Sequence, residues 1–343
     1  MSRSIDQTVA GKYDKRADVP LQRSRIANLR KVNNYVKAAL LAIFTEHPSS
    51  RRNDGHQTSI LQQALWPCLH MVPNQPAVVL PEFSCNSILD LCCGRGGDLP
   101  KYAHSDARRV VIADVSQISV EEAISRYNEM KPRPQYEMLA IHADCTVPGL
   151  ITDSSLGKGT FDIVACQFAL HYACSSPQCL EGLLSNVSDA LHPGGVFIGT
   201  TLDSNEIVRR LKATSSGFEL ASCNATLQNS LFKLTYMSNG AVTVFGMKYL
   251  FQLADAIDDI PEYMVHFPSL VMLASNVGLA LIPQFTTSFS RFVKYAHETG
   301  LAEGMIDHVN RSESIWDTLS SDERDVLGLY MTFAFVKRTP RKI

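Results

Sequence analysis

The stretch LDLCCGRGGDLPKY, residues 89–102, decides the fold class of this chain. An apolar run containing an acid leads into two cysteines, a glycine-rich turn and the composition of a helix start. A short apolar strand, a bare turn and a helix are how a βα unit begins. The turn Gly94-Arg95-Gly96-Gly97 lets a ligand approach the backbone closely and offers it amide groups.

Short apolar runs and helical stretches continue to alternate along the chain. The helical stretch SVEEAISRYNEM, residues 119–130, is expected to begin at Ser119, with two glutamates in its first turn. Strands separated by helices form βαβ units, so the pattern predicts an α/β fold with a doubly wound, mostly parallel sheet. The expected strands are the runs at 86–91, 109–115, 136–145, 160–172 and 194–202, with a last one at 327–338.

Helical segments precede this α/β body. Residues 24–44 carry apolar side chains at helical spacing, which predicts an amphipathic helix. A polar loop follows, and residues 58–70 predict a second helix. We therefore divide the chain into a basic N-terminal helical extension, residues 1–57, and a main domain, residues 58–343.

The rhythm of the sequence changes after residue 202. Residues 231–251 alternate around Asn239-Gly240, which is typical of a tight β-hairpin. Residues 254–278 predict a loop, a proline-opened segment and a helix that ends at a glycine. These segments form an insertion in the main domain, at about residues 203–277.

Composition is that of an ordinary globular protein, with 343 residues, 45% hydrophobic content and a net charge of −2. No apolar run reaches the roughly 18 residues of a membrane span, and the N-terminus lacks the apolar core of a secretory signal. We expect an intracellular protein without a membrane anchor. The first 52 residues carry eleven Lys and Arg against four acids, so they could meet phosphates; a solvated arm is the alternative.

The cysteines predict neither a disulfide framework nor a metal site. Nine cysteines, an odd number within apolar stretches, are typical of buried free thiols in a reducing compartment. Cys174 and Cys179 lie five apart without a second Cys or His pair, so no zinc site is expected. No nucleophile, His and Asp arrangement stands out either, and no acid–base catalytic residue is expected.

Acids after consecutive strands indicate the ligand better than the glycines do. A dinucleotide site would place a third glycine where Leu99 stands, so a nicotinamide or flavin is the weaker reading. Asp114 ends the second strand, 18 residues after Gly96, where a carboxylate accepts ribose hydroxyls. Asp144 follows the third strand and suits an exocyclic amine, while Asp90 in the first strand could orient the turn or meet a cationic group. A ribose, an adenine and a positive charge without phosphate describe S-adenosylmethionine.

Methyl transfer from a sulfonium explains why no general base stands out. The reaction is an in-line displacement in which holding the two atoms together supplies most of the rate. An acceptor with an available lone pair needs no proton removed, and no metal is expected.

The ordered motifs resemble those of the mRNA cap guanine-N7 methyltransferases, from about residue 13 to residue 337. The resemblance implies the class I S-adenosylmethionine-dependent methyltransferase fold, the capped 5′ end of mRNA as substrate, and the nucleus as location. Other capping enzymes or the transcription machinery are implied as partners. Besides the opening stretch, the motifs are NNYVKAAL (33–40), ADVS (113–116), RYNEM (126–130), CQFALHY (166–172), LHPGGVFIGTT (191–201), FGMKYLF (245–251), PEYMVHFP (261–268) and LYMTFAF (329–335).

The resemblance also implies individual site residues. For the cofactor these are Lys37, which would pair with the methionine carboxylate, the backbone at Cys92, Asp114, Asp144, Gln167 and Tyr172; the residue pattern adds Asp90 and Gly94. For the cap they are Asn33, Asn34, Arg95, Asp98, Arg126, His171, Tyr172, Glu262 and Tyr330. Arg95 and Arg126 suit the triphosphate bridge, because a guanidinium matches phosphate geometry. Glu262 would accept from the guanine edge and favour the charge gained on N7.

Simpler interpretations exist for several of these residues. Asn33, Asn34 and Lys37 could be the solvated face of a helix, and Tyr330 could be core. The family usually has glycine where this chain has Cys92, and a side chain is tolerable there unless the backbone angle is one that only glycine reaches. Two other functions stay open: a methyltransferase for another RNA or a small molecule, and a cap-binding scaffold without catalysis.

Overall fold

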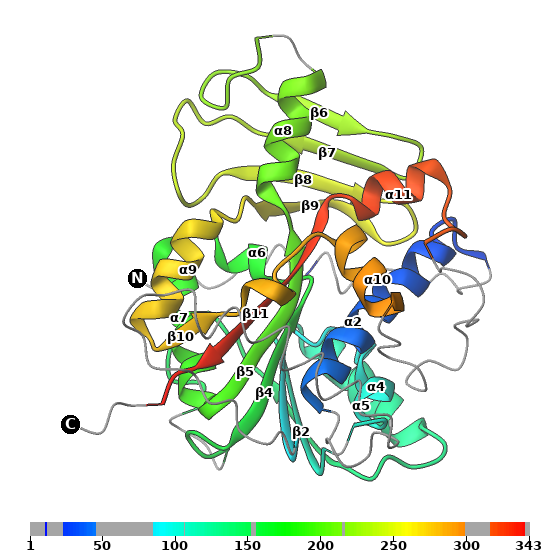
Figure 1. Ribbon diagram of the computed structural model, residues 1–343, viewed down its shortest axis with the longest axis vertical. Coiled ribbons are helices and arrows are strands. Elements are labelled where there is room, and N and C mark those ends of the chain that lie inside the picture. The colour runs from blue at the N-terminus through cyan, green and yellow to red at the C-terminus, as the bar shows by residue number, and fades with distance from the viewer. Residues whose placement is uncertain are drawn as a thin grey trace.

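The structure, a computed structural model, describes residues 11, 23–45, 85–105, 107–151, 156–214, 217–298 and 316–339. Two β-sheets follow one another along the long axis of the molecule (Figure 1). The smaller sheet stands above the larger one in that view, beside α8 (Ser204–Thr214). The helix predicted at 58–70 and the boundary after residue 57 lie outside the described residues.

Seven strands form the larger sheet, in the order β10-β11-β5-β4-β1-β2-β3. Strands β1 to β5 run parallel, whereas β11 is antiparallel to both of its neighbours. The doubly wound, mostly parallel sheet is therefore confirmed. Its strands are β1 (Ser87–Leu91), β2 (Arg109–Asp114), β3 (Glu137–His142), β4 (Phe161–Gln167), β5 (Leu191–Leu202), β10 (Leu279–Leu281) and β11 (Tyr330–Lys337).

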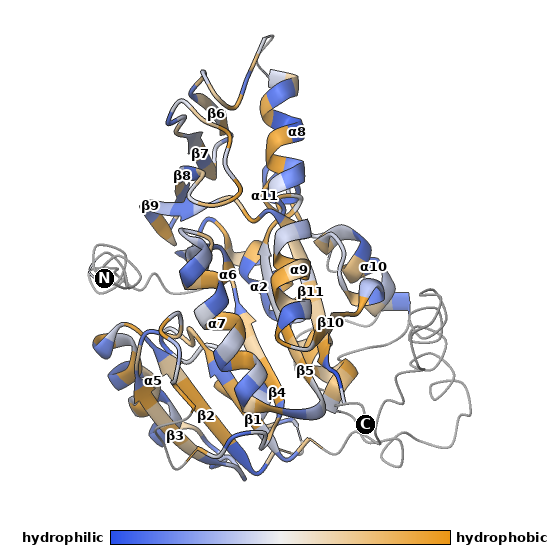
Figure 2. Ribbon diagram, turned by 90° about the vertical axis from the view of Figure 1, so that its left-hand side faces the viewer, coloured by the Kyte–Doolittle hydropathy of each residue, from blue (hydrophilic) through white to orange (hydrophobic). Residues whose placement is uncertain are grey.

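Helices cover both faces of this sheet. Because neighbouring residues of a strand point to opposite faces, Ile88 and Leu89 of β1 belong to two different buried clusters. The central strands are accordingly mostly apolar on both faces, as Figure 2 shows for β1, β2 and β4. One cluster is shared with α2 (Ala27–Thr45), α4 (Leu99–Tyr102), α5 (Gln117–Glu129) and α10 (Phe289–Glu298), and the other with α6 (Leu170–Ala173), α7 (Pro177–Ala190) and α9 (Phe267–Asn276).

Two predicted boundaries in this domain are wrong. α5 begins after Ser116, whose hydroxyl accepts from the Ser119 amide at 3.0 Å, so Ser116 and not Ser119 is the N-cap. The run 160–172 is not one strand, because β4 ends at Gln167 and α6 begins at Leu170. The break falls on Phe168, which has a positive φ of 56°.

The smaller sheet is antiparallel, in the order β6-β7-β8-β9. Its strands are β6 (Ala225–Gln228), β7 (Phe232–Tyr236), β8 (Lys248–Leu253) and β9 (Ile257–Tyr263). The predicted pairing within 231–251 is confirmed, since Phe232 lies opposite Leu253 and Tyr236 opposite Tyr249. The tight turn is wrong, because residues 237–247 form a longer connection between the two strands.

The segment 254–278 also differs from its prediction. Residues expected to be a loop and a proline-opened segment form β9, in which Pro261 lies opposite Leu250 of β8. Proline is tolerated there because β9 is an edge strand of the smaller sheet. The helix predicted after it is α9, followed by Gly278 with φ 81°.

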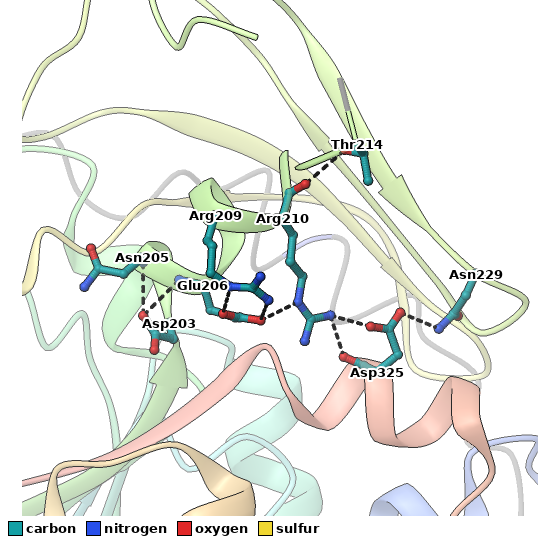
Figure 3. A network of polar contacts seen from close by, with 8 residues as sticks. All are labelled: Asp203, Asn205, Glu206, Arg209, Arg210, Thr214, Asn229 and Asp325. Carbon is teal, nitrogen blue, oxygen red and sulfur yellow. Dashed lines mark hydrogen bonds and ion pairs between the residues drawn. The ribbon is translucent and has the colours of Figure 1, made fainter. Parts of the chain in front are cut away.

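A polar network joins α8 to α11 (Ser321–Leu327), a helix that the sequence analysis did not predict (Figure 3). Arg210 on α8 lies between two carboxylates, with Nε 2.7 Å from Oε1 of Glu206 and Nη1 2.5 Å from Oδ1 of Asp325. Asn229, between β6 and β7, donates to the other oxygen of Asp325 at 3.1 Å. The network fixes the smaller sheet to the larger domain through side chains of both.

Within the ranges that the structure describes, no helix is both long and apolar enough to cross a membrane.

Candidate active site

The predicted cofactor residues converge at the carboxyl edge of the larger sheet. β1 lies between β2 and β4 in the sheet. After β1 the chain adds β2 and β3 on one side of it, and then β4 and β5 on its other side, so the strand order reverses at β1. In such open sheets, ligands bind outside the carboxyl ends of the strands at this point of reversal. Asp114 and Gln167 end β2 and β4, while Gly94 and Asp144 follow β1 and β3.

Asp114 holds the glycine turn and the start of α5 together. Its Oδ2 accepts from the Gly94 amide at 2.8 Å, and its Oδ1 accepts from the Ser116 amide at 2.9 Å. A Cβ placed on Gly94 would meet nothing within 4 Å, so the space beside the turn is open. A Cβ on Gly96 would lie 2.7 Å from Leu99, which explains why that position is glycine.

Cys92 adopts the backbone conformation that the family's usual glycine favours. Its φ is 58°, in the left-handed region, which costs a side chain on the order of 1–2 kcal/mol. The side chain packs against the buried cluster under the turn, where Sγ lies 3.3 Å from Sγ of Cys145. Cysteine at this position therefore has a strained backbone angle, which destabilises the fold slightly relative to glycine.

Asp144 is held by its own loop. Its Oδ1 accepts from the amide and the hydroxyl of Thr146, at 2.9 and 2.7 Å. Asn186 on α7, 1% exposed, donates to the Cys145 carbonyl at 2.9 Å and accepts from the Gly149 amide at 3.0 Å. Gly182 has no Cβ, and a Cβ at this position would clash with the Thr146 carbonyl. The glycine therefore lets α7 lie directly against this loop.

Asp90 is buried within β1 at 2% exposure. Burial and the nearby charge of Asp98 raise its pKa to about 8, although a hydrogen bond with Tyr102 and the charge of Lys37 oppose the shift. The carboxyl group is therefore mostly protonated at neutral pH.

Lys37 and Asp98, predicted for different ligands, form one ion pair. Lys37 Nζ on α2 lies 2.6 Å from Oδ1 of Asp98, and Lys101 Nζ lies 2.8 Å from the same oxygen. Lys101 also donates to Oδ1 of Asn34 at 2.9 Å, so α2 is fixed to the start of α4. Burial raises the pKa of Asp98, but the two ammonium groups outweigh it and hold that pKa well below its usual range.

An aromatic group borders this ion pair. The Phe168 ring lies 5.2 Å from the Tyr330 ring, nearly perpendicular to it, and Lys37 Nζ is 5.9 Å from the Phe168 centroid. Phe168 joins β4 to α6 with a positive φ, a conformation that clusters at functional sites. Beside it, Oε1 of Gln167 accepts from the Thr200 hydroxyl at 3.0 Å.

His171, Tyr172 and Glu262 form a buried polar cluster where α6 meets β9. Glu262 Oε1 on β9 lies 3.4 Å from His171 Nε2 and 3.3 Å from the Tyr172 hydroxyl, both on α6. Both ring nitrogens of His171 and Oε2 of Glu262 are buried without a hydrogen-bond partner. The structure thus groups Tyr172 with the predicted acceptor residues.

Tyr249 on β8 adjoins this cluster. Its hydroxyl is buried and makes no hydrogen bond of good geometry, although it is close to Glu262. Burial, the charge of Glu262 and the side-chain contact with that carboxylate raise the pKa of Tyr249 well above its usual value. Unpartnered polar atoms in a buried cluster are expected where a polar ligand completes the hydrogen bonds.

Arg95 and Arg126 share one side of α5. Arg95 Nε lies 3.0 Å from Oε2 of Glu122, and Arg126 follows Glu122 by one helical turn. Asn33 on α2 has a buried side-chain oxygen without a hydrogen-bond partner. Asn33 thus lies on α2, Arg126 on α5, and Arg95 in the glycine turn beside α5.

Comparison with known proteins identifies the family. A family model described as mRNA (guanine-N(7))-methyltransferase domain matches residues 80–338. The chain belongs to the mRNA cap guanine-N7 methyltransferases. It is 31% identical to mRNA cap guanine-N(7) methyltransferase 1 of Oryza sativa subsp. japonica, covering 98% of this chain and 82% of that one. It is 30% identical to the Caenorhabditis elegans mRNA cap guanine-N(7) methyltransferase, covering 96% and 86%.

Among solved structures, an S-adenosylmethionine-dependent methyltransferase from Clostridium acetobutylicum aligns with a TM-score of 0.43 and 13% identity, over 74% of this chain and 85% of that one. The family match confirms the predicted enzyme class, mRNA (guanine-N7)-methyltransferase, and S-adenosylmethionine as its cofactor. A methyltransferase for another substrate and a non-catalytic scaffold are not favoured. The roles of single residues in this cap methyltransferase stay predictions.

Three residues of the cap methyltransferase site were missed from the sequence. Phe168, Lys101 and Tyr249 all lie within motifs that carry the family resemblance, which was the available signal. Their partners are distant in sequence, however: Phe168 meets Tyr330 and Lys37, and Tyr249 approaches Glu262. Only the fold brings these partners together.

Proposed function

We propose that this enzyme transfers a methyl group to N7 of the cap guanosine of mRNA, with the guanine bound beside Glu262. The observation that carries the proposal is the Glu262 carboxylate, which is 2% exposed and has one oxygen without a hydrogen-bond partner. A buried acceptor without a hydrogen bond destabilises the protein unless a ligand donates to it. The N–H groups on the Watson–Crick edge of guanine are such donors.

Glu262 would also favour the product electrostatically. Guanine gains a positive charge when N7 is methylated, and a fixed carboxylate in a buried site stabilises that charge more than water would. His171 and Tyr172, which contact Glu262, would hold the base in place. The N7 lone pair is available, so none of these residues needs to remove a proton.

The residues at the carboxyl edge fit S-adenosylmethionine. When bound, this cofactor supplies an electrophilic methyl group on a positively charged sulfur. Asp114 would accept the ribose hydroxyls, Asp144 the adenine amine, and Lys37 would pair with the methionine carboxylate. The open space beside Gly94 leaves room for the chain between them.

Polar residues on α2, on α5 and in the glycine turn would bind the rest of the cap. Arg95 and Arg126 would contact the triphosphate bridge, with Arg95 released from Glu122 as it does so. Asn33 and Asn34 would donate from α2. Arg126 is exposed, which suits a contact made only when RNA is bound.

Methyl transfer to three acceptors tests the proposal: GpppG-capped RNA, the same RNA with an uncapped triphosphate end, and free GTP. We expect turnover with capped RNA and a product methylated at N7. The Glu262→Gln variant keeps the shape but loses the charge, so kcat should fall about 100-fold. Glu129→Gln, at an exposed position of α5, is the matched control. Transfer to uncapped RNA alone would contradict the proposal.

We place the enzyme in the nucleus, with other capping enzymes or the transcription machinery as partners. The support is the proposed substrate, since nascent mRNA is made there. Imaging of the tagged full chain in its native cells tests the location. A tagged chain confined to the cytoplasm would contradict it.

A further inference from the structure

Two cysteines meet beneath the glycine turn of the cofactor site. Cys92 follows β1 and Cys145 follows β3, and their sulfur atoms are 3.3 Å apart. Cys145 is 1% exposed, whereas Cys92 is half-buried at the site edge. Two loops that are predicted to hold different parts of the cofactor are therefore in contact through these thiols.

The cluster is suited to a disulfide better than to a metal ion. In the ranges that the structure describes, no three His, Cys, Asp or Glu side chains are arranged to hold a metal. A protein disulfide needs a sulfur–sulfur distance of about 2.05 Å, so the pair must close by about 1.2 Å. Formation of the bond therefore requires at least one of the two loops to move.

We propose that Cys92 and Cys145 are a reversible oxidative modification site, and that their disulfide weakens S-adenosylmethionine binding. The effect on binding rests on the proposed cofactor site. In the reaction, one thiol sulfur attacks an oxygen of a peroxide, forming a sulfenic acid and releasing one water. The second sulfur then attacks the sulfenic sulfur, the S–S bond forms, and a second water leaves. Two thiols are oxidised and one O–O bond is reduced.

Closure of this bond would distort the site. Asn186 fixes the Cys145 backbone, so we expect the turn at Cys92 to move more. That turn carries the Gly94 amide, which donates to Asp114. A displacement of about 1 Å at positioning groups is enough to cost an order of magnitude or more.

The two thiols are not equivalent. The hydrogen bond with Cys145 lowers the pKa of Cys92, although the Cys166 thiol and burial outweigh it and leave that pKa raised. For Cys145, the same hydrogen bond and burial both raise the pKa. Because Cys92 is half-buried and Cys145 is 1% exposed, we expect Cys92 to attack the peroxide first, slowly at neutral pH and faster as the pH rises, since the thiolate is the nucleophile.

Calorimetry with S-adenosylmethionine on reduced and peroxide-treated full chain tests the proposal. We expect a Cys92–Cys145 crosslink in non-reducing peptide mass spectrometry, at least a tenfold loss of affinity, and recovery with dithiothreitol. Cys92→Gly and Cys145→Ala should lose the oxidation effect, each compared with its own reduced form. Cys223→Ser, which removes a half-buried cysteine of the smaller sheet domain, should behave as the unmodified chain.

Linkage gives a second measurement. If the disulfide lowers cofactor affinity tenfold, saturating S-adenosylmethionine stabilises the reduced pair and must raise its midpoint potential by about 30 mV. A disulfide that leaves affinity unchanged, or peroxide treatment that yields no Cys92–Cys145 crosslink, would overturn the inference. Reduced protein that fails to bind the cofactor would instead contradict the proposed function, while peptide mapping would still decide whether the disulfide forms.

Discussion

Lys37 Nζ and Asp98 Oδ1 lie 2.6 Å apart and connect α2 to the residue that precedes α4. Lys101 shares the same carboxylate oxygen at 2.8 Å, so two ammonium groups depend on one acid. A ligand carboxylate that reached Lys37 would leave Asp98 still paired with Lys101. The pair can therefore hold α2 in place without the cofactor and release Lys37 when it binds.

Replacement of Asp98 should destabilise the fold. In Asp98→Asn, two lysines that are about one-tenth exposed lose their counter-charge. Removing one partner of a buried ion pair costs about 3–5 kcal/mol. Urea unfolding should show this loss, and Asp258→Asn, at an exposed position of β9, should show almost none. Equal stability of both variants would mean that the lysines find other partners.

The charge of Asp98 also sets a pH range. Its pKa is lowered from 3.8, so its contribution is present above that value and is lost only as pH falls below it. Because the charge of Asp98 also raises the pKa of Asp90, the comparison is made in an Asp90→Asn background, where the stability difference caused by Asp98→Asn should be constant between about pH 5 and 8. Urea titrations at several pH values measure it, and a difference that varied across this range would contradict the low pKa.

Asp114 should be essential for cofactor affinity. Asp114→Ala removes both carboxylate oxygens, which accept from the Gly94 and Ser116 amides. It also removes the predicted contact with the ribose. We expect affinity for S-adenosylmethionine to fall by about 100-fold or more, because each lost hydrogen bond to a charged group is worth about 1.5–3 kcal/mol. Calorimetry measures it, with Asp317→Asn as an exposed control. Unchanged affinity would remove Asp114 from the site.

The fold was predictable where local pattern and global packing agree. The parallel strands were predictable because most of them are buried on both faces and therefore consist mainly of apolar residues; β3, whose residues are exposed or half-buried, follows the same apolar pattern more weakly. Prediction failed where tertiary contacts decide. β9 contains Pro261 and charged residues, and only its pairing with β8 makes it a strand. α11 is short, and its capping box at Ser320 and Glu323 was overlooked.

The candidate site was predictable only as a set of residue types. Asp114 and Asp144 could be placed, because parallel strands end at one edge of the sheet. Their partners could not, since no spacing rule gives the contact of Lys37 with Asp98, which are 61 positions apart, or of Cys92 with Cys145. Such contacts depend on how loops and helices pack over that edge.

Asn186 should act as the positioning residue for the Asp144 loop. Its side chain donates to the Cys145 and Val147 carbonyls and accepts from the Gly149 and Leu150 amides. Asn186→Ala leaves these groups unpaired and should lower the free energy of unfolding by about 2–4 kcal/mol. The KM for S-adenosylmethionine should rise while kcat changes less. Asn276→Ala, at an exposed helix end, is the control. An unchanged KM in a folded variant would show that the loop needs no support from α7.

His192 and Asp162, at the opposite edge of the sheet, should give stability a distinct pH dependence. His192 Nε2 lies 3.0 Å from Oδ1 of Asp162, and Oδ2 accepts from the Ser87 amide at 2.8 Å. The Asp162 hydrogen bond raises the pKa of His192 above 6.5. Burial raises the pKa of Asp162, but the hydrogen bonds from His192 and Ser87 outweigh it, so the net shift is below 3.8.

The two shifts define a window for this pair. The raised histidine contributes fully below pH 6.5 and loses its contribution as pH rises through its folded pKa. The lowered aspartate contributes above pH 3.8 and loses its contribution as pH falls. The stability difference between the unmodified chain and His192→Asn should therefore be largest between these two values and shrink above neutrality. Urea unfolding from pH 4 to 9 measures it, with His104→Asn as the exposed control. A difference that grew above pH 7 would mean that His192 is neutral when it binds Asp162.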